Sequence, residues 1–164
     1  MPYLRKTIIL LFILLPLSLF AKEYNHRILE QQVLSSSASK PEGVLIEFKG
    51  NVGKWVWVTQ RIESYIRQIR NKYPDMEIEI VVHGKGIRNL TQASYDYGDA
   101  KKKLKILSDS GIEVSVCGGK SKKMNIPLDS YADFINVAVS APARIQELKL
   151  DGYVHIVAGE NEYY

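Results

Sequence analysis

The sequence predicts a single α/β domain in which a mostly parallel sheet is covered by helices on both faces. Short apolar runs typical of strands alternate with stretches whose apolar residues recur every three or four positions, as in amphipathic helices. The length of 164 residues fits one domain. Hydrophobic residues make up 46% of the chain and charged residues 24%, which excludes a largely disordered chain and a multi-pass membrane protein.

The first twenty-one residues have the pattern of a secretory signal peptide. Arg5 and Lys6 give a basic start, an apolar stretch runs from Ile8 to Phe20, and the small Ala21 follows. The stretch is shorter than the ~20 residues that a spanning helix needs, and Pro16 interrupts it. We expect cleavage after Ala21, a periplasmic location and no membrane span in the mature chain. An uncleaved anchor is the alternative.

Residues 22–43 are predicted to form an arm or linker, and residues 44–164 the α/β domain. The stretch 30–42 holds four serines and a proline but few large apolar groups, which is typical of a linker.

The domain opens with a strand, a helix and a second strand. Residues 44–48 form a short apolar run, which favours a buried strand. Apolar residues from Trp55 to Tyr73 lie on one stripe of a predicted helix that ends before Pro74. A second strand over residues 77–83 stops at Gly84.

The alternation continues to the end of the chain. A second helix has Ala100, Leu104 and Leu107 on its inner side and is followed by a strand over residues 112–117. Further strands are predicted at residues 135–139 and 153–157.

Ser140 suits the N-cap of a third helix, which buries Ile145 and Leu148. Strands separated by helices in this way favour a parallel sheet, because parallel strands need long crossover connections.

Cys117 is the first candidate for chemistry, because functional groups in such sheets collect at the carboxyl ends of the strands. Alternation along the strand places Cys117 with Glu113 and Ser115 on the more polar face. The thiol is either a nucleophile or a small buried residue that fills space. Both interpretations stay open on the residues alone.

The residues after Cys117 favour a reactive sulfur. Gly118 and Gly119 let backbone or substrate approach closely. Amides of the following turn, together with Lys120 and Lys122, would favour a thiolate, which is the better nucleophile.

His83 ends the second predicted strand and is the second candidate. A histidine there can orient a ligand or shuttle a proton, although one bonded to a neighbouring loop is the alternative. Neighbouring strands lie ~4.8 Å apart, so His83 can reach Cys117 only if their strands are adjacent.

Several other functions are excluded or not indicated. The single cysteine allows no intramolecular disulfide and no zinc site built on several thiolates. Asn89 stands where a dinucleotide-binding fingerprint needs its third glycine. We expect no cofactor and no metal. We also expect no nucleic-acid partner, because the formal net charge of +4 falls to +2 once Arg5 and Lys6 are removed with the signal peptide. Glu77 and Glu79 share a strand face and are interpreted as solvated.

The segment from Gly111 to Gly119, GIEVSVCGG, resembles the DsrE/DsrF-like (sulfur-relay) family. The likeness continues through Val137–Ser140 and Gly152–Ile156. It implies a flavodoxin-like domain with a five-stranded parallel sheet, assembled as a trimer or hexamer. In the relay members, the cysteine at the place of Cys117 accepts sulfane sulfur as a persulfide and passes it to a partner protein.

The resemblance yields one hypothesis and leaves an alternative. The hypothesis is an exported member that handles sulfane sulfur through Cys117, at most a sulfurtransferase-like carrier with a donor or acceptor protein as partner. The alternative is a non-enzymatic oligomeric module that binds a ligand or partner and has a structural cysteine. Relay relatives often carry Arg-Gly where this chain has Met124-Asn125.

Overall fold

The computed structural model describes residues 27–50, 55–96 and 99–159, in which five strands and four α-helices alternate. The strands are β1 (Gly43–Lys49), β2 (Glu77–His83), β3 (Glu113–Cys117), β4 (Asn136–Ala138) and β5 (Tyr153–Gly159). The α-helices are α2 (Trp55–Lys72), α3 (Ala100–Asp109), α4 (Gly118–Lys123) and α5 (Ala141–Leu150). Shorter turns of helix are η1 (Leu29–Leu34), η3 (Lys85–Leu90) and η5 (Leu128–Ser130). The predicted signal peptide lies outside the described residues.

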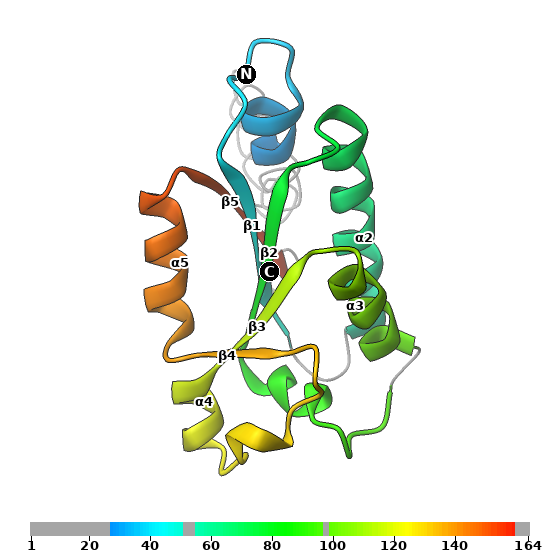
Figure 1. Ribbon diagram of the computed structural model, residues 1–164, viewed down its shortest axis with the longest axis vertical. Helices are drawn as coiled ribbons and strands as arrows, with labels where there is room; N and C mark the ends of the chain where they lie inside the picture. The colour runs from blue at the N-terminus through cyan, green and yellow to red at the C-terminus, as the bar shows by residue number, and fades with distance from the viewer. Residues whose placement is uncertain (1–26, 51–54, 97–98, 160–164) are drawn as a thin grey trace, which may run out of the picture.

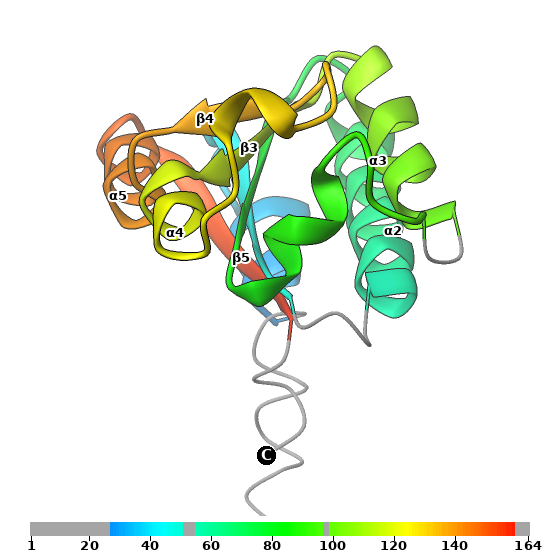
Figure 2. The same ribbon diagram turned by 90° about the horizontal axis from the view of Figure 1, so that it is seen from below.

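The strands form one sheet in the order β4-β3-β2-β1-β5, and every neighbouring pair is parallel. Helices α2 and α3 cover one face, whereas α4 and α5 lie on the other (Figures 1 and 2). The carboxyl ends of the strands therefore share one edge of the sheet, at the lower end of Figure 1. This arrangement confirms the predicted five-stranded parallel sheet flanked by helices.

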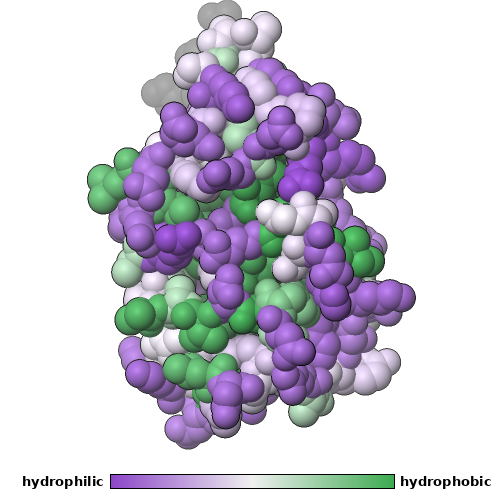
Figure 3. All heavy atoms as spheres, viewed as in Figure 1, coloured by the Kyte–Doolittle hydropathy of each residue, from purple (hydrophilic) through white to green (hydrophobic). Residues whose placement is uncertain are grey.

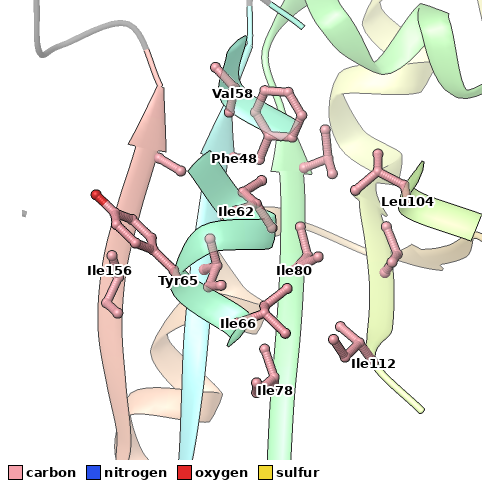
Figure 4. Packing of buried hydrophobic residues seen from close by; sticks show 14 of the residues in the cluster. Phe48, Val58, Ile62, Tyr65, Ile66, Ile78, Ile80, Leu104, Ile112 and Ile156 are labelled. Carbon is pink, nitrogen blue, oxygen red and sulfur yellow. The ribbon is translucent and has the colours of Figure 1, made fainter. Parts of the chain in front are cut away.

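The face under α2 and α3 holds the main hydrophobic core. Val44, Ile46 and Phe48 alternate along β1 toward this face and are fully buried. The predicted apolar stripe of α2, with Ile62 and Ile69 fully buried, packs against them (Figure 4). Central strands of parallel sheets are buried on both faces, which explains the nearly continuous apolar run of β1.

The face under α5 is mixed in character. A small apolar cluster joins Leu45 and Val81 of the sheet to Ile145 and Leu148 of α5, and Cys117 belongs to it. Polar side chains are buried on the same face and are described below. The sheet thus has one apolar face, which stabilises the fold, and one partly polar face.

Part of the predicted arm packs onto the domain. Leu29 and Val33 of η1 are fully buried in the main core. The Lys72 ammonium group donates hydrogen bonds to the carbonyl oxygens of Val33 at 2.9 Å and Ser35 at 2.7 Å. The position of the domain boundary stays a prediction. None of the described helices is long and apolar enough to cross a membrane.

Candidate functional site

The strand order makes β2 and β3 neighbours near the centre of the sheet. Both end at the edge formed by the carboxyl ends of the strands, called the carboxyl edge below. The chain leaves β2 toward η3 and α3 on one face and leaves β3 toward α4 on the other (Figure 2). Where connections of adjacent strands leave on opposite faces, open α/β sheets form the crevice in which ligands bind. His83 ends β2 and Cys117 ends β3, so the two predicted site residues flank this position.

The sulfur of Cys117 is held by two backbone amides. Cys117 Sγ accepts hydrogen bonds from the backbone N–H groups of Lys120 and Ala141, each at 3.4 Å. Lys120 lies in the first turn of α4, and Ala141 is the first residue of α5. Two backbone N–H groups from the starts of two helices therefore converge on the sulfur.

Helix α4 was not predicted from the sequence, where Gly118 and Gly119 indicated only the end of a strand. It forms because Cys117 is its N-cap residue, with extended backbone and a sulfur that satisfies the Lys120 amide. The Ser121 hydroxyl strengthens this start by donating to the Cys117 carbonyl oxygen at 2.9 Å.

A buried hydroxyl pair ties α4 to the segment before β4. Ser121 Oγ lies 2.7 Å from Tyr131 Oη, and both residues are buried. Burial is the main cause that raises the pKa of Tyr131, and the bond to Ser121 partly opposes it. The phenol is therefore a neutral structural group. Sequence reasoning missed this pair, whose only local signal is a serine four residues after the cysteine.

Gly118 and Gly119 differ in how closely other atoms approach them. A Cβ atom on Gly118 would lie 2.8 Å from the Ala138 carbonyl oxygen and 3.2 Å from a methyl carbon of Val137. A Cβ atom on Gly119 would meet only the Val139 carbonyl oxygen, at 3.6 Å. The expected close approach of backbone is therefore present at Gly118, where α4 packs on β4.

Alanine substitutions at the two glycines should have opposite effects. Gly118→Ala should destabilise the fold and displace α4 from β4, because backbone atoms cannot yield as a flexible side chain does. Gly119→Ala should be neutral or stabilise by about 0.5 kcal/mol, because alanine is the better helix former. Chemical denaturation measures both changes. Equal stability of the two variants would contradict the packing described here.

Lys120 and Lys122 follow the cysteine on α4. Lys120 brings its backbone amide to the sulfur, and the Lys122 side chain is exposed. Their predicted influence as cations stays a prediction. The Arg88 guanidinium of η3 donates to the Met124 carbonyl oxygen at 3.4 Å, just after α4.

His83 is bound by a neighbouring strand. Its Nε2 lies 2.5 Å from Oε1 of Glu47 on β1, and Glu47 is buried. Among the described residues, no hydrogen bond joins His83 to Cys117. Sequence reasoning missed Glu47, although a single carboxylate inside an apolar strand was a usable signal.

The interpretation of Glu79 as solvated was wrong. Glu79 is buried and accepts hydrogen bonds from the Arg144 guanidinium of α5, with Nη2 2.6 Å from Oε2. The Ser115 hydroxyl donates to Glu79 Oε1 at 3.1 Å. The expectation failed because burial there depends on α5 crossing β2, which the residues around Glu79 do not reveal. Glu77 is exposed, as expected.

In the part of the chain that the structure describes, no group of three or more His, Cys, Asp or Glu residues is placed to hold a metal ion. The arrangement at the carboxyl edge is instead one sulfur with two amide donors. It can attack an electrophilic sulfur or carbon, or hold a ligand against the edge.

Fold and site together define a class: a parallel α/β domain with a cysteine at the end of its third strand. A model of the DsrE/DsrF-like family matches residues 59–158, and the chain belongs to this family. Membership supports a role related to sulfur relay at the level of the family.

Two solved structures have the same fold. A protein of unknown function, MTH1491 from Methanobacterium thermoautotrophicum, aligns with a TM-score of 0.59 and 17% identity over 70% of this chain and 96% of that chain. The ychN protein from E. coli aligns with a TM-score of 0.58 and 11% identity over 71% of this chain and 98% of that chain. A search of curated proteins finds no match.

Proposed function

We propose that this chain is an exported sulfur carrier that accepts sulfane sulfur on Cys117 and passes it to an acceptor protein. The observation that carries the proposal is the pair of backbone amides, from Lys120 and Ala141, directed at Cys117 Sγ. Such donors stabilise the thiolate, and they would also stabilise negative charge on a persulfide formed there.

The proposed step is a displacement on sulfur. The Cys117 thiolate attacks the outer sulfur of a donor, a new S–S bond forms, and the S–S bond of the donor breaks with its electron pair on the leaving group. With thiosulfate the products are the Cys117 persulfide anion and sulfite. Attack by an acceptor thiolate then removes the outer sulfur in the same way. No external oxidant is needed.

The charges around the sulfur favour an anionic donor. The stretches directly after β2 and β3, residues 84–95 and 118–128, contain no Asp or Glu, and the first carboxylates beyond them are Asp96 and Asp129. They carry five cationic side chains: Lys85, Arg88, Lys120, Lys122 and Lys123. A single sign of charge beside a crevice raises the local concentration of oppositely charged substrates.

Mass spectrometry of the folded protein tests the proposal. Incubation with thiosulfate or polysulfide under anaerobic conditions should add multiples of about 32 Da, one per sulfur atom, to Cys117. The Cys117→Ser variant should gain nothing. Native protein that stays at its original mass, while a small-molecule thiol in the same mixture is persulfidated, would refute sulfur acceptance.

A second candidate function is a binding module in which the cysteine is structural. Cys117 is only 8% exposed and packs among apolar side chains of the sheet and α5, which favours this alternative. Alkylation by iodoacetamide separates the two. A carrier thiol reacts in the folded protein near neutral pH, whereas a structural thiol reacts only after unfolding.

We also propose that the carrier works in the periplasm and as a homo-oligomer, a trimer or hexamer. The leader-like start of the sequence supports export. Val139, before α5, is 90% exposed, and Leu150, at the end of α5, is 87% exposed. Figure 3 shows apolar side chains gathered at the lower left, over β4, α4 and the start of α5. Apolar surface of this kind is typical of contacts between subunits.

A further inference from the structure

Three side chains form one hydrogen-bonded row across the neighbouring strands β2, β1 and β5. Glu47 Oε1 pairs with His83 Nε2 at 2.5 Å, and Glu47 Oε2 pairs with His155 Nε2 at 2.8 Å. Glu47 is only 7% exposed, so the two imidazoles are the main partners of both carboxylate oxygens. His83 and His155 lie on either side of Glu47 and remain partly exposed, with side chains 20% and 23% accessible.

The charge state of Glu47 fixes the proton on each imidazole. The hydrogen bonds from His155 and then His83 hold the pKa of Glu47 well below its usual range, although burial opposes them. An ionised carboxylate only accepts hydrogen bonds, so each imidazole donates from Nε2. When His83 is neutral, its free electron pair is therefore on Nδ1.

His83 and Cys117 occupy neighbouring places on the sheet. The register pairs Val82 of β2 with Val116 of β3, and each candidate residue is the next one along its strand. Alternation puts both side chains on the α5 face. Adjacent strands lie ~4.8 Å apart, and among the described residues no hydrogen bond joins the two side chains. Their proton exchange therefore passes through one bridging water in this proposal.

Among the described residues, Lys49 is the other charged group that contacts the row. Lys49 Nζ lies 3.7 Å from Glu47 Oε1 and its side chain is 46% exposed. Helix α5, which covers this face, contributes Ile145 and Leu148 to the apolar cluster, and its Arg144 is bound by Glu79.

We propose that Glu47 is a positioning residue for Cys117, which fixes His83 as the base that accepts the thiol proton. In this step the S–H bond breaks, its electron pair stays on sulfur, and the proton binds His83 Nδ1. His155 holds the second carboxylate oxygen and so orients Glu47. The inference extends the proposed function, because it names the proton acceptor for the same sulfur.

The test is the pH profile of Cys117 alkylation by iodoacetamide, a reaction that needs no sulfane donor. Glu47→Gln should slow alkylation about tenfold near pH 7 and move the profile to higher pH, since a general base contributes at least this much. His83→Gln should have a similar effect. The double variant should lose no more than either single one, because the two residues act as a unit.

Glu79→Gln is the matched control, because it removes a buried carboxylate from the same face without touching the imidazoles. It should alkylate within about twofold of wild type. Circular dichroism confirms that each variant is folded. A folded Glu47→Gln protein with the wild-type profile, or effects of Glu47 and His83 that simply add, would overturn the inference. A wild-type thiol that reacts only after unfolding would also overturn it.

The two proposals fail separately. Glu47-dependent alkylation without any sulfur added by thiosulfate or polysulfide would refute sulfur acceptance and leave the positioning role standing. Sulfur added equally well to wild type and to Glu47→Gln, with unchanged alkylation profiles, would refute the positioning role and leave sulfur acceptance standing.

Discussion

Replacing Arg144 by alanine is expected to lower the free energy of unfolding by about 3 kcal/mol. The Glu79 side chain is only 4% exposed, and the Arg144 guanidinium binds both of its oxygens. Without Arg144, the carboxylate keeps the Ser115 hydroxyl as a partner, and an ionised group stays buried without a counter-charge. Urea denaturation followed by circular dichroism measures the loss.

A control variant and a rescue variant test whether the loss comes from the buried ion pair. Glu147→Ala removes only the exposed partner of Arg144, because the Glu147 side chain is 61% accessible. This variant should change the free energy of unfolding by less than about 1 kcal/mol. The double variant Glu79→Met/Arg144→Met should recover most of the lost stability, because apolar pairs replace buried ion pairs well. A loss below about 1 kcal/mol for Arg144→Ala would show that water solvates Glu79 in the folded state.

Replacing Glu47 by alanine is expected to lower the free energy of unfolding at pH 7 by about 3 kcal/mol, because two charge-assisted hydrogen bonds of about 1.5 kcal/mol each are lost. The bonds from His155 and His83 depress the pKa of Glu47 below its ordinary 4.5. A group with a depressed folded-state pKa contributes stability that is fully present above its unfolded pKa. This contribution is lost as the pH falls through the folded-state value.

The difference between wild type and Glu47→Ala should therefore be largest near neutral pH and shrink as the pH falls below 4.5. Denaturation at a series of pH values measures it. Glu113→Ala is the control, because Glu113 is exposed on the same face and its one hydrogen bond among the described residues comes from the Asn136 amide, at 3.1 Å. Its effect should be small at every pH. A Glu47→Ala difference that does not change with pH would contradict the lowered pKa.

Much of the fold could be predicted from the sequence because it depends on local patterns. The apolar stripe after Trp55 and the stop at Pro74 locate α2, which ends at Lys72. The β2 strand was predicted with its observed bounds, Glu77–His83, and β3 begins one residue later than predicted, at Glu113. Helix α4 was missed because two glycines and a run of lysines favour a loop.

The site could be predicted only in part. Alternation along β3 placed Cys117 at the strand end on the same face as Glu113 and Ser115, which is the α5 face, but the sulfur there packs in a small apolar cluster. The Ala141 amide reaches the sulfur because β4 pairs with β3, so that Ala138 lies beside Cys117. The pairing of Glu47 with two histidines likewise depends on strand order and register. A single sequence specifies neither.

The two amides that hold the sulfur have a consequence for how the molecule opens. They belong to α4, which precedes β4 in the chain, and to α5, which follows it. Strand β4 has three residues and lies at the border of the sheet, where β3 is its one partner among the described strands. Border segments of this kind detach at lower free energy than the central strands. Detachment of β4 would release the sulfur while β1 and β2 stay paired. Thiol labelling in weak denaturant would then measure this partial opening, and hydrogen exchange in β1 would measure the unfolding of the whole domain.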